Sequence, residues 1–243
     1  MEKQNLLYEG KAKRMFNTND ETVLWVEYLD QVTALNGGMK DQMQGKAELN
    51  NQITSAIFEY LSNQGIKNHF LEKLSKTEQL IKKRSIIPLE VVVRNISAGS
   101  FSKRLGVEEG QVLPSPIVEF YYKKDELDDP FINDSHIAFL KLATPEEIAE
   151  LKKQALLINE QLIKLFKKID LQLVDFKVEF GRTDIGEIEL ADEISPDTCR
   201  LWDIATNKHM DKDVYRRKIG NIIPVYQEVL DRLNQLSLEN KGE

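Results

Sequence analysis

LVDFKVEFG, residues 173–181, alternates apolar and charged side chains. Successive side chains of a β-strand point to opposite faces, so this alternation predicts a strand with one apolar and one charged face. The apolar face would carry Val174, Phe176, Val178 and Phe180, and the charged face Asp175, Lys177 and Glu179. An amphipathic strand with a solvated polar face has the same pattern, so the strand alone does not indicate a function.

A second strand is predicted over residues 187–194, after the turn-forming stretch GRTDIG at 181–186. It adds four carboxylates, those of Glu187, Glu189, Asp192 and Glu193. A hairpin would bring some of them beside Glu179, in a register that the sequence leaves open. Clustered carboxylates repel each other unless a cation lies between them, and Mg²⁺ with a nucleotide phosphate is the usual solution.

The rest of the chain predicts an α+β protein in two lobes. Strand patterns occur at 22–28 and, around Pro88, at 80–93, with a glycine turn at 36–38 between them. Helical spacing over 46–64 ends at Gly65, and Thr144 begins a capping box before a long helix. A last helical region is expected over about 213–236, with a kink at Pro224. Because strands dominate the beginning and helices the end, we expect a lobe boundary near residues 84–88.

The composition limits the classes of function. The chain has 243 residues and a net charge of −7, which argues against a general nucleic-acid binder. No run approaches the roughly 18–20 apolar residues of a membrane span. Cys199 is the single cysteine, and the N-terminus lacks the apolar core of a secretory signal. We therefore expect a soluble cytoplasmic protein without an intrachain disulfide.

Three further segments offer groups for binding an anion. In the first, Arg94 ends a predicted strand and residues 97–100, SAGS, can open a helix toward a phosphate monoester. The second, GKAKR at 10–14, can fold over nucleotide phosphates, and the third contains Asp197 and Arg200. Each segment also has a purely structural explanation. In order, these are a strand-end arginine with a turn, a solvated basic turn and a surface ion pair. The three histidines lack neighbours at metal-ligand spacing, so we expect packing or surface roles for His69, His136 and His209.

Taken together, these segments resemble the phosphoribosylaminoimidazole-succinocarboxamide synthase (SAICAR synthetase) family of purine biosynthesis. IIPLEVVVRNISAGS at 86–100 and LVDFKVEFG at 173–181 are similar to two long family signatures. YEGKAKRMF, DELDDPFIND, ADEISPDTCRLWD and DKDVYRRKIG also occur in the family's order, so the resemblance spans essentially the whole chain. It implies the reaction of ATP, CAIR and L-aspartate to ADP, phosphate and SAICAR. CAIR is 5-amino-1-(5-phosphoribosyl)imidazole-4-carboxylate.

The resemblance also implies a fold and an assembly. The fold is a smaller antiparallel-sheet lobe over residues 1–86 and a larger α+β lobe over 87–243, with ATP in the cleft between them. The implied cofactor is Mg²⁺, and the implied assembly is a homodimer with no nucleic-acid or membrane partner. The reaction would pass through an acyl-phosphate of CAIR, because a carboxylate is a poor electrophile.

The site residues implied by the resemblance fall into four groups. Glu179 and Asp192 would hold Mg²⁺, and Lys177 and Asp175 would act at the reacting groups. The ATP side would comprise Lys11, Ala12, Lys13, Lys82 and Lys123, and the substrate side Arg94, Ser100, Asp197, Arg200 and Arg216. Two alternatives stay open: an ATP-dependent small-molecule kinase and a nucleotide-binding protein without catalysis.

Overall fold

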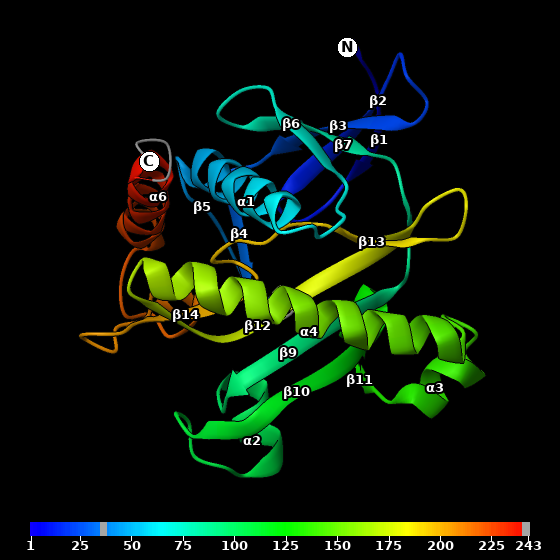
Figure 1. Cartoon of the computed structure of the whole chain (residues 1–243). Helices are drawn as coiled ribbons and strands as arrows, with labels where there is room; N and C mark the ends of the chain where they lie inside the picture. The colour runs from blue at the N-terminus through cyan, green and yellow to red at the C-terminus, as the bar shows by residue number, and fades with distance from the viewer. Residues whose placement is uncertain (35–37, 240–243) are drawn as a thin grey trace.

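The computed structural model describes residues 1–34 and 38–239. The fold is α+β with mainly antiparallel sheets (Figure 1), which confirms the predicted class. Its strands are β1 (Lys3–Glu9), β2 (Lys13–Thr18), β3 (Val23–Tyr28), β4 (Gln31–Ala34), β5 (Met39–Gln42), β6 (Phe70–Lys73), β7 (Glu78–Lys82), β8 (Ser85–Ile86), β9 (Leu89–Ile96), β10 (Val112–Tyr122), β11 (Phe131–Ile132), β12 (Leu171–Arg182), β13 (Ile188–Ala191) and β14 (Cys199–Asp203). Its helices are α1 (Lys46–Asn63), α2 (Gly99–Leu105), α3 (Asp134–Phe139), α4 (Pro145–Lys168), α5 (Asp213–Arg216) and α6 (Ile222–Glu239), with one 3₁₀ turn, η1 (Asp125–Leu127). In the predicted turn at 36–38, Asn36 and Gly37 lie outside the described residues.

The first sheet contains five antiparallel strands in the order β1-β2-β3-β7-β6. β3 confirms the strand predicted at 22–28. This sheet packs around a small core of its own, formed by Leu24, Val26, Tyr28, Ala47 and Ile81.

The second sheet is organised around β12, which confirms and extends the strand predicted at 173–180. β12 pairs with β14 near its start, with β9 in the middle and with β13 and β8 near its end. Asp175 therefore stands opposite both Arg94 on β9 and Arg200 on β14. Glu179 stands opposite Ala191, so Asp192 directly follows the paired segment. The predicted hairpin is confirmed, and its register places two acidic positions side by side.

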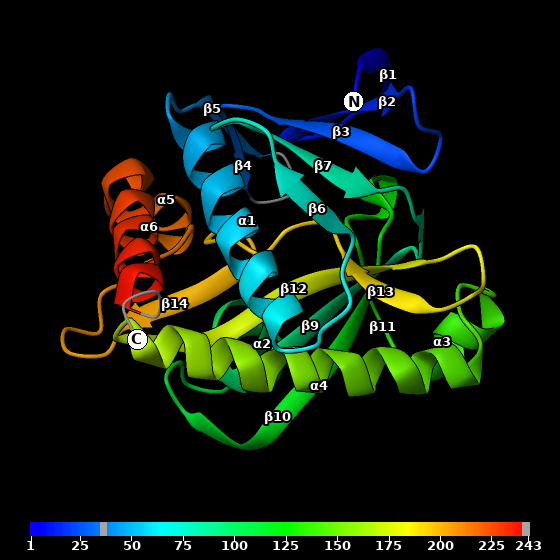
Figure 2. The same ribbon diagram turned by 45° about the horizontal axis from the view of Figure 1, so that its top comes forward.

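The larger core lies between the second sheet and three helices, α1, α4 and α6 (Figure 2). The capping box predicted at the start of α4 is present, because Thr144 and Glu147 exchange side-chain to backbone hydrogen bonds. α1 ends at Asn63, and Gly65 follows with φ +81°, a conformation that glycine adopts without strain. α1 and α6 pack side by side in both ribbon views, which brings residues from distant parts of the chain together.

The apolar face of β12 differs from the prediction at one residue. Phe176, Val178 and Phe180 belong to the larger core, but Val174 packs in a separate cluster with Ile96 and Ala98. The pairing of β12 with β14 shifts between Leu173 and Asp175. A bulge of this kind changes the face on which the following side chains lie, which the period-two pattern cannot show.

The predicted kinked helix over 213–236 is wrong, since two helices separated by residues 217–221 stand in its place. Pro224 lies in the first turn of α6, where the missing N–H removes no intrahelical hydrogen bond and causes no kink. The Asn221 side chain accepts a hydrogen bond from the Ile223 N–H at 2.9 Å and so caps the helix.

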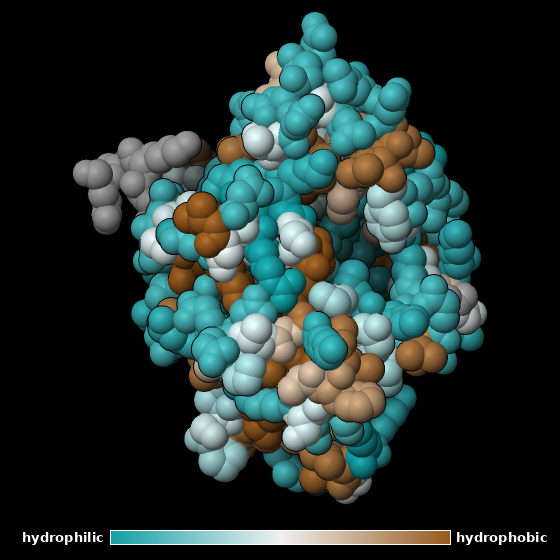
Figure 3. Space-filling model, turned by 90° about the vertical axis from the view of Figure 1, so that its right-hand side faces the viewer, coloured by the Kyte–Doolittle hydropathy of each residue, from teal (hydrophilic) through white to brown (hydrophobic). Residues whose placement is uncertain are grey.

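None of the helices among the described residues is both long enough and apolar enough to cross a membrane. The face shown in Figure 3 is mostly hydrophilic, with hydrophobic side chains scattered over it. That distribution is ordinary for a folded chain, whose surface always retains some apolar atoms.

Candidate active site

Five charged side chains from four parts of the chain form one group, which we call the lysine–carboxylate cluster: Lys13, Lys123, Lys177, Glu179 and Asp192. Lys123 and Lys177 both donate to Oε1 of Glu179, at 2.6 and 3.0 Å. Lys13 donates to Oδ1 of Asp192 at 2.5 Å, and Lys177 Nζ lies 3.8 Å from Oδ2 of the same residue. The cluster therefore joins the first sheet to β12 and to the end of the β12–β13 hairpin.

Lys177, Lys13 and Asp192 of the cluster stay charged at neutral pH. Burial alone would lower the pKa of Lys177, but the carboxylates of Glu179, Glu90 and Asp192 outweigh it and raise that pKa well above its ordinary value. Lys13 behaves in the same way, because Asp192 and Glu193 raise its pKa against the effect of burial. Burial raises the pKa of Asp192, yet Lys13, Lys177 and Lys123 together hold it below its usual range. The cluster is thus a set of fixed charges suited to binding phosphates and a cation.

A chain of alternating arginines and carboxylates, which we call the arginine chain, lies along the first half of β12. Its members in order are Glu119, Arg94, Asp175, Arg200, Asp213 and Arg216. Arg94 donates to Glu119 and to Asp175, each at 2.7 Å. Arg200 donates to Asp175 at 2.9 Å and to Asp213 at 3.0 Å, and Arg216 donates to Asp213 at 2.7 Å. Asp175 and Asp213 therefore each lie between two arginines, which keeps those guanidinium groups in a fixed orientation.

Ser100 and Gly99 complete this region at the start of α2. The Ser100 hydroxyl accepts a hydrogen bond from Arg94 at 3.1 Å, so its own proton is free to reach another acceptor. Gly99 has φ +56°, and a Cβ there would lie 2.4 Å from Nη2 of Arg200. Only glycine lets the backbone approach the guanidinium this closely.

Asp197 lies beside these two groups and is almost fully buried. Its Oδ2 accepts from Lys46 at 2.6 Å, and its Oδ1 accepts from the hydroxyl of Tyr226 at 2.6 Å. Lys212 Nζ is 3.6 Å from Oδ2. Lys212 and Lys46 hold the pKa of Asp197 below its usual range although burial opposes them.

Comparison with known proteins gives one consistent family. The family described as SAICAR synthetase matches residues 6–233. The phosphoribosylaminoimidazole-succinocarboxamide synthase of Enterococcus faecalis is 63% identical over 233 residues, which are 96% of this chain and 98% of that protein. The corresponding enzyme of Lactococcus lactis subsp. lactis is 64% identical over 233 residues, with the same coverage. The chain belongs to the SAICAR synthetase family.

Solved structures of the family agree with the fold. A phosphoribosylaminoimidazole-succinocarboxamide synthase from Ehrlichia chaffeensis has a TM-score of 0.92 at 46% identity, covering 95% of this chain and 98% of that one. A SAICAR synthetase in complex with ADP has a TM-score of 0.90 at 46% identity, covering 93% and 96%. The chain is therefore an ATP-dependent ligase that joins CAIR and L-aspartate in purine biosynthesis. This assignment decides against the kinase and non-catalytic alternatives.

The remaining candidates on the nucleotide side contact residues outside the cluster. Lys11 is exposed and pairs with Asp125 at 2.8 Å, and the Ala12 carbonyl accepts from the Leu29 N–H at 2.8 Å. Lys82 donates to the Asn68 carbonyl at 3.1 Å and lies 3.8 Å from Glu189. Lys13 and Lys123, by contrast, are joined directly to the two acidic candidates.

Several residues of the site were not predicted from the sequence. They are Lys46, Glu90, Glu119, Lys212, Asp213 and Tyr226. Lys212 and Asp213 stand in the quoted stretch DKDVYRRKIG, so that signal was available. The buried pairs of Lys46 and Tyr226 with Asp197 join residues 151 and 29 positions apart, for which no local pattern exists.

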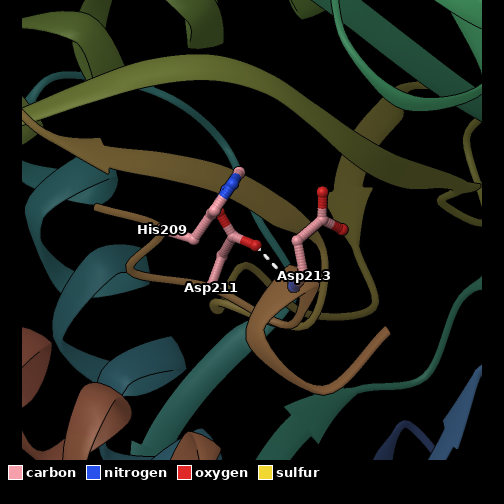
Figure 4. Close-up of side chains that lie close together, drawn as sticks. All are labelled: His209, Asp211 and Asp213. Atoms are coloured by element: carbon pink, nitrogen blue, oxygen red, sulfur yellow. Dashed lines mark hydrogen bonds between the residues drawn. The ribbon is translucent and has the colours of Figure 1, made fainter. Parts of the chain in front are cut away.

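His209, Asp211 and Asp213 form a further group whose possible ligand atoms lie within 4.8 Å of one another (Figure 4). The two carboxylates are already engaged. Asp211 accepts from the Leu201 N–H and, along the dashed line of Figure 4, from the Asp213 N–H at 2.6 Å. Asp213 accepts from Arg200 and Arg216. This group therefore supports the arginine chain, and its carboxylates have hydrogen-bond partners without a metal ion.

Proposed function

We propose that the lysine–carboxylate cluster is the phosphoryl-transfer centre and the arginine chain the CAIR phosphate site. The observation that carries this assignment is the convergence of Lys13, Lys123 and Lys177 on Glu179 and Asp192, next to the arginines around Asp175. Phosphoryl transfer from ATP places negative charge on the γ-phosphate oxygens, and fixed cations stabilise that charge. The related SAICAR synthetase with bound ADP supports a nucleotide site in this fold.

Mg²⁺ fits the two carboxylates of the cluster. Glu179 and Asp192 offer hard oxygen ligands, and Oε2 of Glu179 and Oδ2 of Asp192 accept no hydrogen bond from the described residues. When bound there, the ion would offset charge on the ATP phosphates. In this structure Lys13 pairs with Asp192, and Lys177 pairs with Glu179. With Mg²⁺ and ATP bound, both ammonium groups would turn toward the phosphates.

The substrate-binding roles follow from charge and position. Arg94, Ser100 and Arg200 would bind the ribose phosphate of CAIR, held in place by Asp175. On the side of the substrate carboxylates we place Arg216 and Asp197. Along the nucleotide we place Lys11, Ala12 and Lys82. Arg94 is only 2% exposed, so Arg200 and Ser100 present the more accessible donors to a phosphate.

We further propose that the reaction passes through an acyl-phosphate of CAIR. A carboxylate oxygen of CAIR would attack the γ-phosphorus, and ADP would leave. The deprotonated amine of L-aspartate would then attack the acyl carbon and expel inorganic phosphate, which carries the CAIR oxygen with it. Lys177, which donates to Glu90 and Glu179, would stabilise charge in both steps.

An isotope experiment tests this route. CAIR labelled with ¹⁸O in its carboxylate should yield singly labelled inorganic phosphate when ATP, Mg²⁺ and L-aspartate are present. Omitting one component at a time, and following ADP and SAICAR, gives the matched controls. Unlabelled phosphate from fully labelled CAIR would exclude the acyl-phosphate.

We also propose a lobe boundary, an assembly state and a cellular location for the chain. We place the lobe boundary at 86/87, because the strands of the first sheet all precede it and those of the second, except β8, follow it. A homodimer and a cytoplasmic location are proposed from the family resemblance and the single buried cysteine. Sedimentation of the purified protein tests the dimer.

A further inference from the structure

Asp197 is engaged entirely by the protein itself. Its side chain is 5% exposed, and each of its carboxylate oxygens already accepts one short hydrogen bond. One donor, Lys46, is the first residue of α1, and the other, Tyr226, is on α6. Both donors are completely buried. We call Lys46, Asp197 and Tyr226 the Asp197 clamp, because side chains from two packed helices donate to one carboxylate from two sides.

Among the described residues, Lys212 has one ion pair, a longer contact with Asp197. Lys46 lies 2.6 Å from Asp197, but Lys212 is 3.6 Å from the same Oδ2 atom and forms no hydrogen bond to it. Burial lowers the pKa of Lys212, and the nearby cations Lys46 and Arg216 lower it further against Asp197 and Glu193. A negatively charged ligand would stabilise the charged form of a buried ammonium in this position.

Lys212 is also the member of this group that reaches the surface. Its side chain is 12% exposed, whereas that of Lys46 is 0% exposed. The Lys212 N–H donates to the Pro196 carbonyl at 3.0 Å, which ties it to the loop that carries Asp197. Its neighbour Asp213 holds Arg200 and Arg216, so Lys212 stands between the Asp197 clamp and the arginine chain.

We propose that Lys46 and Tyr226 are positioning residues, which hold Asp197 so that the ammonium of Lys212 is presented to a carboxylate of L-aspartate. This inference rests on the proposed function. The lysine–carboxylate cluster is assigned there to the ATP phosphates, and Arg94 and Arg200 to the phosphate of CAIR. L-Aspartate brings two carboxylates to the site, and Lys212 and Arg216 are two further cations next to the CAIR arginines. If Asp197 were free to turn, it would form a closer pair with Lys212 and neutralise its ammonium.

Tyr226→Phe is the sharpest test, because it removes one hydroxyl and keeps the buried ring. Steady-state kinetics are measured with each of the three substrates varied in turn. We expect the KM for L-aspartate to rise roughly 5- to 20-fold, since a hydrogen bond to a charged group is lost next to the binding group. The KM for ATP should stay within about twofold of wild type, because the clamp makes no contact with the nucleotide-side lysines.

Tyr60→Phe is the matched control, since Tyr60 lies on α1 and its hydroxyl makes only a 3.5 Å contact with the Gln161 carbonyl. It should leave all three KM values unchanged. Lys46→Met is a second variant, which keeps the length of the side chain and removes its charge. We expect it to raise the KM for L-aspartate more than Tyr226→Phe does, because Asp197 would then turn to Lys212. Thermal unfolding of each variant checks that the fold is kept.

The outcomes separate this inference from the proposed function. Wild-type formation of SAICAR, with the ¹⁸O result, tests the function, whereas the ratio of variant to wild-type KM tests the clamp. A selective rise in the KM for L-aspartate supports the inference. Unchanged kinetics in Tyr226→Phe, a rise in the KM for ATP or CAIR instead, or a fall in kcat alone would overturn it.

Discussion

Lys13 and Asp192 are 179 positions apart in the chain, yet the Lys13 ammonium donates to the Asp192 carboxylate at 2.5 Å. The bond joins β2 of the first sheet to the residue that follows β13. Asp192 has φ +61°, a left-handed conformation that costs most residues free energy. Its carbonyl lies 3.2 Å from Nε2 of His69, whose pKa burial lowers, and the neutral ring donates to that carbonyl as the Nε2–H tautomer. The contact is thus built at the junction of the two sheets and depends on both.

Lys13→Met should weaken ATP binding, because it removes a cation that we place against the phosphates. A charge-assisted hydrogen bond to phosphate contributes about 1.5–3 kcal/mol, so the KM for ATP should rise roughly 10- to 150-fold. Lys3→Met is the control, since Lys3 is in the same sheet and pairs with Glu27 and Glu78 away from the site. A KM for ATP within about twofold of wild type in Lys13→Met would remove Lys13 from the nucleotide site.

Glu179→Gln and Asp192→Asn should each abolish turnover while the protein stays folded. Each change removes a carboxylate charge proposed to hold Mg²⁺. Activity is measured over a Mg²⁺ titration. Chelation with EDTA should abolish the activity of the wild type, and added Mg²⁺ should restore it. Glu187→Gln is the control, because Glu187 lies on the same hairpin but forms an exposed pair with Lys67. Near-normal rates at millimolar Mg²⁺ in either site variant would show that its carboxylate is not a metal ligand.

Arg200→Ala should raise the KM for CAIR far more than that for ATP. The expected factor is roughly 10- to 150-fold, the loss of one charge-assisted bond to the ribose phosphate. Arg94→Ala should do the same but also lower stability by about 3–5 kcal/mol, because it leaves Glu119 and Asp175 buried without that partner. Arg14→Ala, which removes an exposed pair with Glu9, is the control for both. If the KM for ATP moved instead, the two arginines would not belong to the CAIR site.

Gly99→Ala should impair CAIR binding as well as stability. The new Cβ would meet the Arg200 guanidinium at 2.4 Å and displace it. Gly106 has a similar backbone conformation, with φ +66°, but open space around it. Gly106→Ala should therefore lower the free energy of unfolding only by the backbone strain, about 1–2 kcal/mol. Comparing kcat/KM for CAIR in the two variants isolates the displacement of Arg200. Equal kcat/KM values in the two would argue that Arg200 does not need its observed position.

The stability of the wild type should fall faster in acid than that of a His69→Gln variant. Burial lowers the pKa of His69 to about 3, against about 6.5 when unfolded. Between these values the unfolded chain binds a proton that the folded chain does not, so stability rises with pH and falls as the pH drops from 6.5 toward 3. The difference in the free energy of unfolding between the two proteins should change by on the order of 1 kcal/mol per pH unit. Urea unfolding of both proteins at pH 7, 6 and 5 measures it, and parallel pH dependence would contradict the prediction.

The local sequence was sufficient for several features that short-range chemistry decides. The capping box at Thr144 and the apolar stripe of α4 are set by residues three and four positions apart. The alternation of Phe176, Val178 and Phe180 likewise depends only on the pleat of one strand. The types of residue needed for a phosphate and metal site, and the family resemblance, were also readable from the chain alone.

Tertiary structure decided which of those residues meet. Asp175 touches both Arg94 and Arg200 because β9 and β14 each pair with β12 at that residue, and strand register depends on the whole sheet. The bulge that moves Val174 out of the larger core leaves no mark in a period-two pattern. Lys46 and Tyr226 look like ordinary helix residues in the sequence. They become partners of Asp197 only because α1 and α6 pack together, where burial makes each unpaired polar group costly and so selects these contacts.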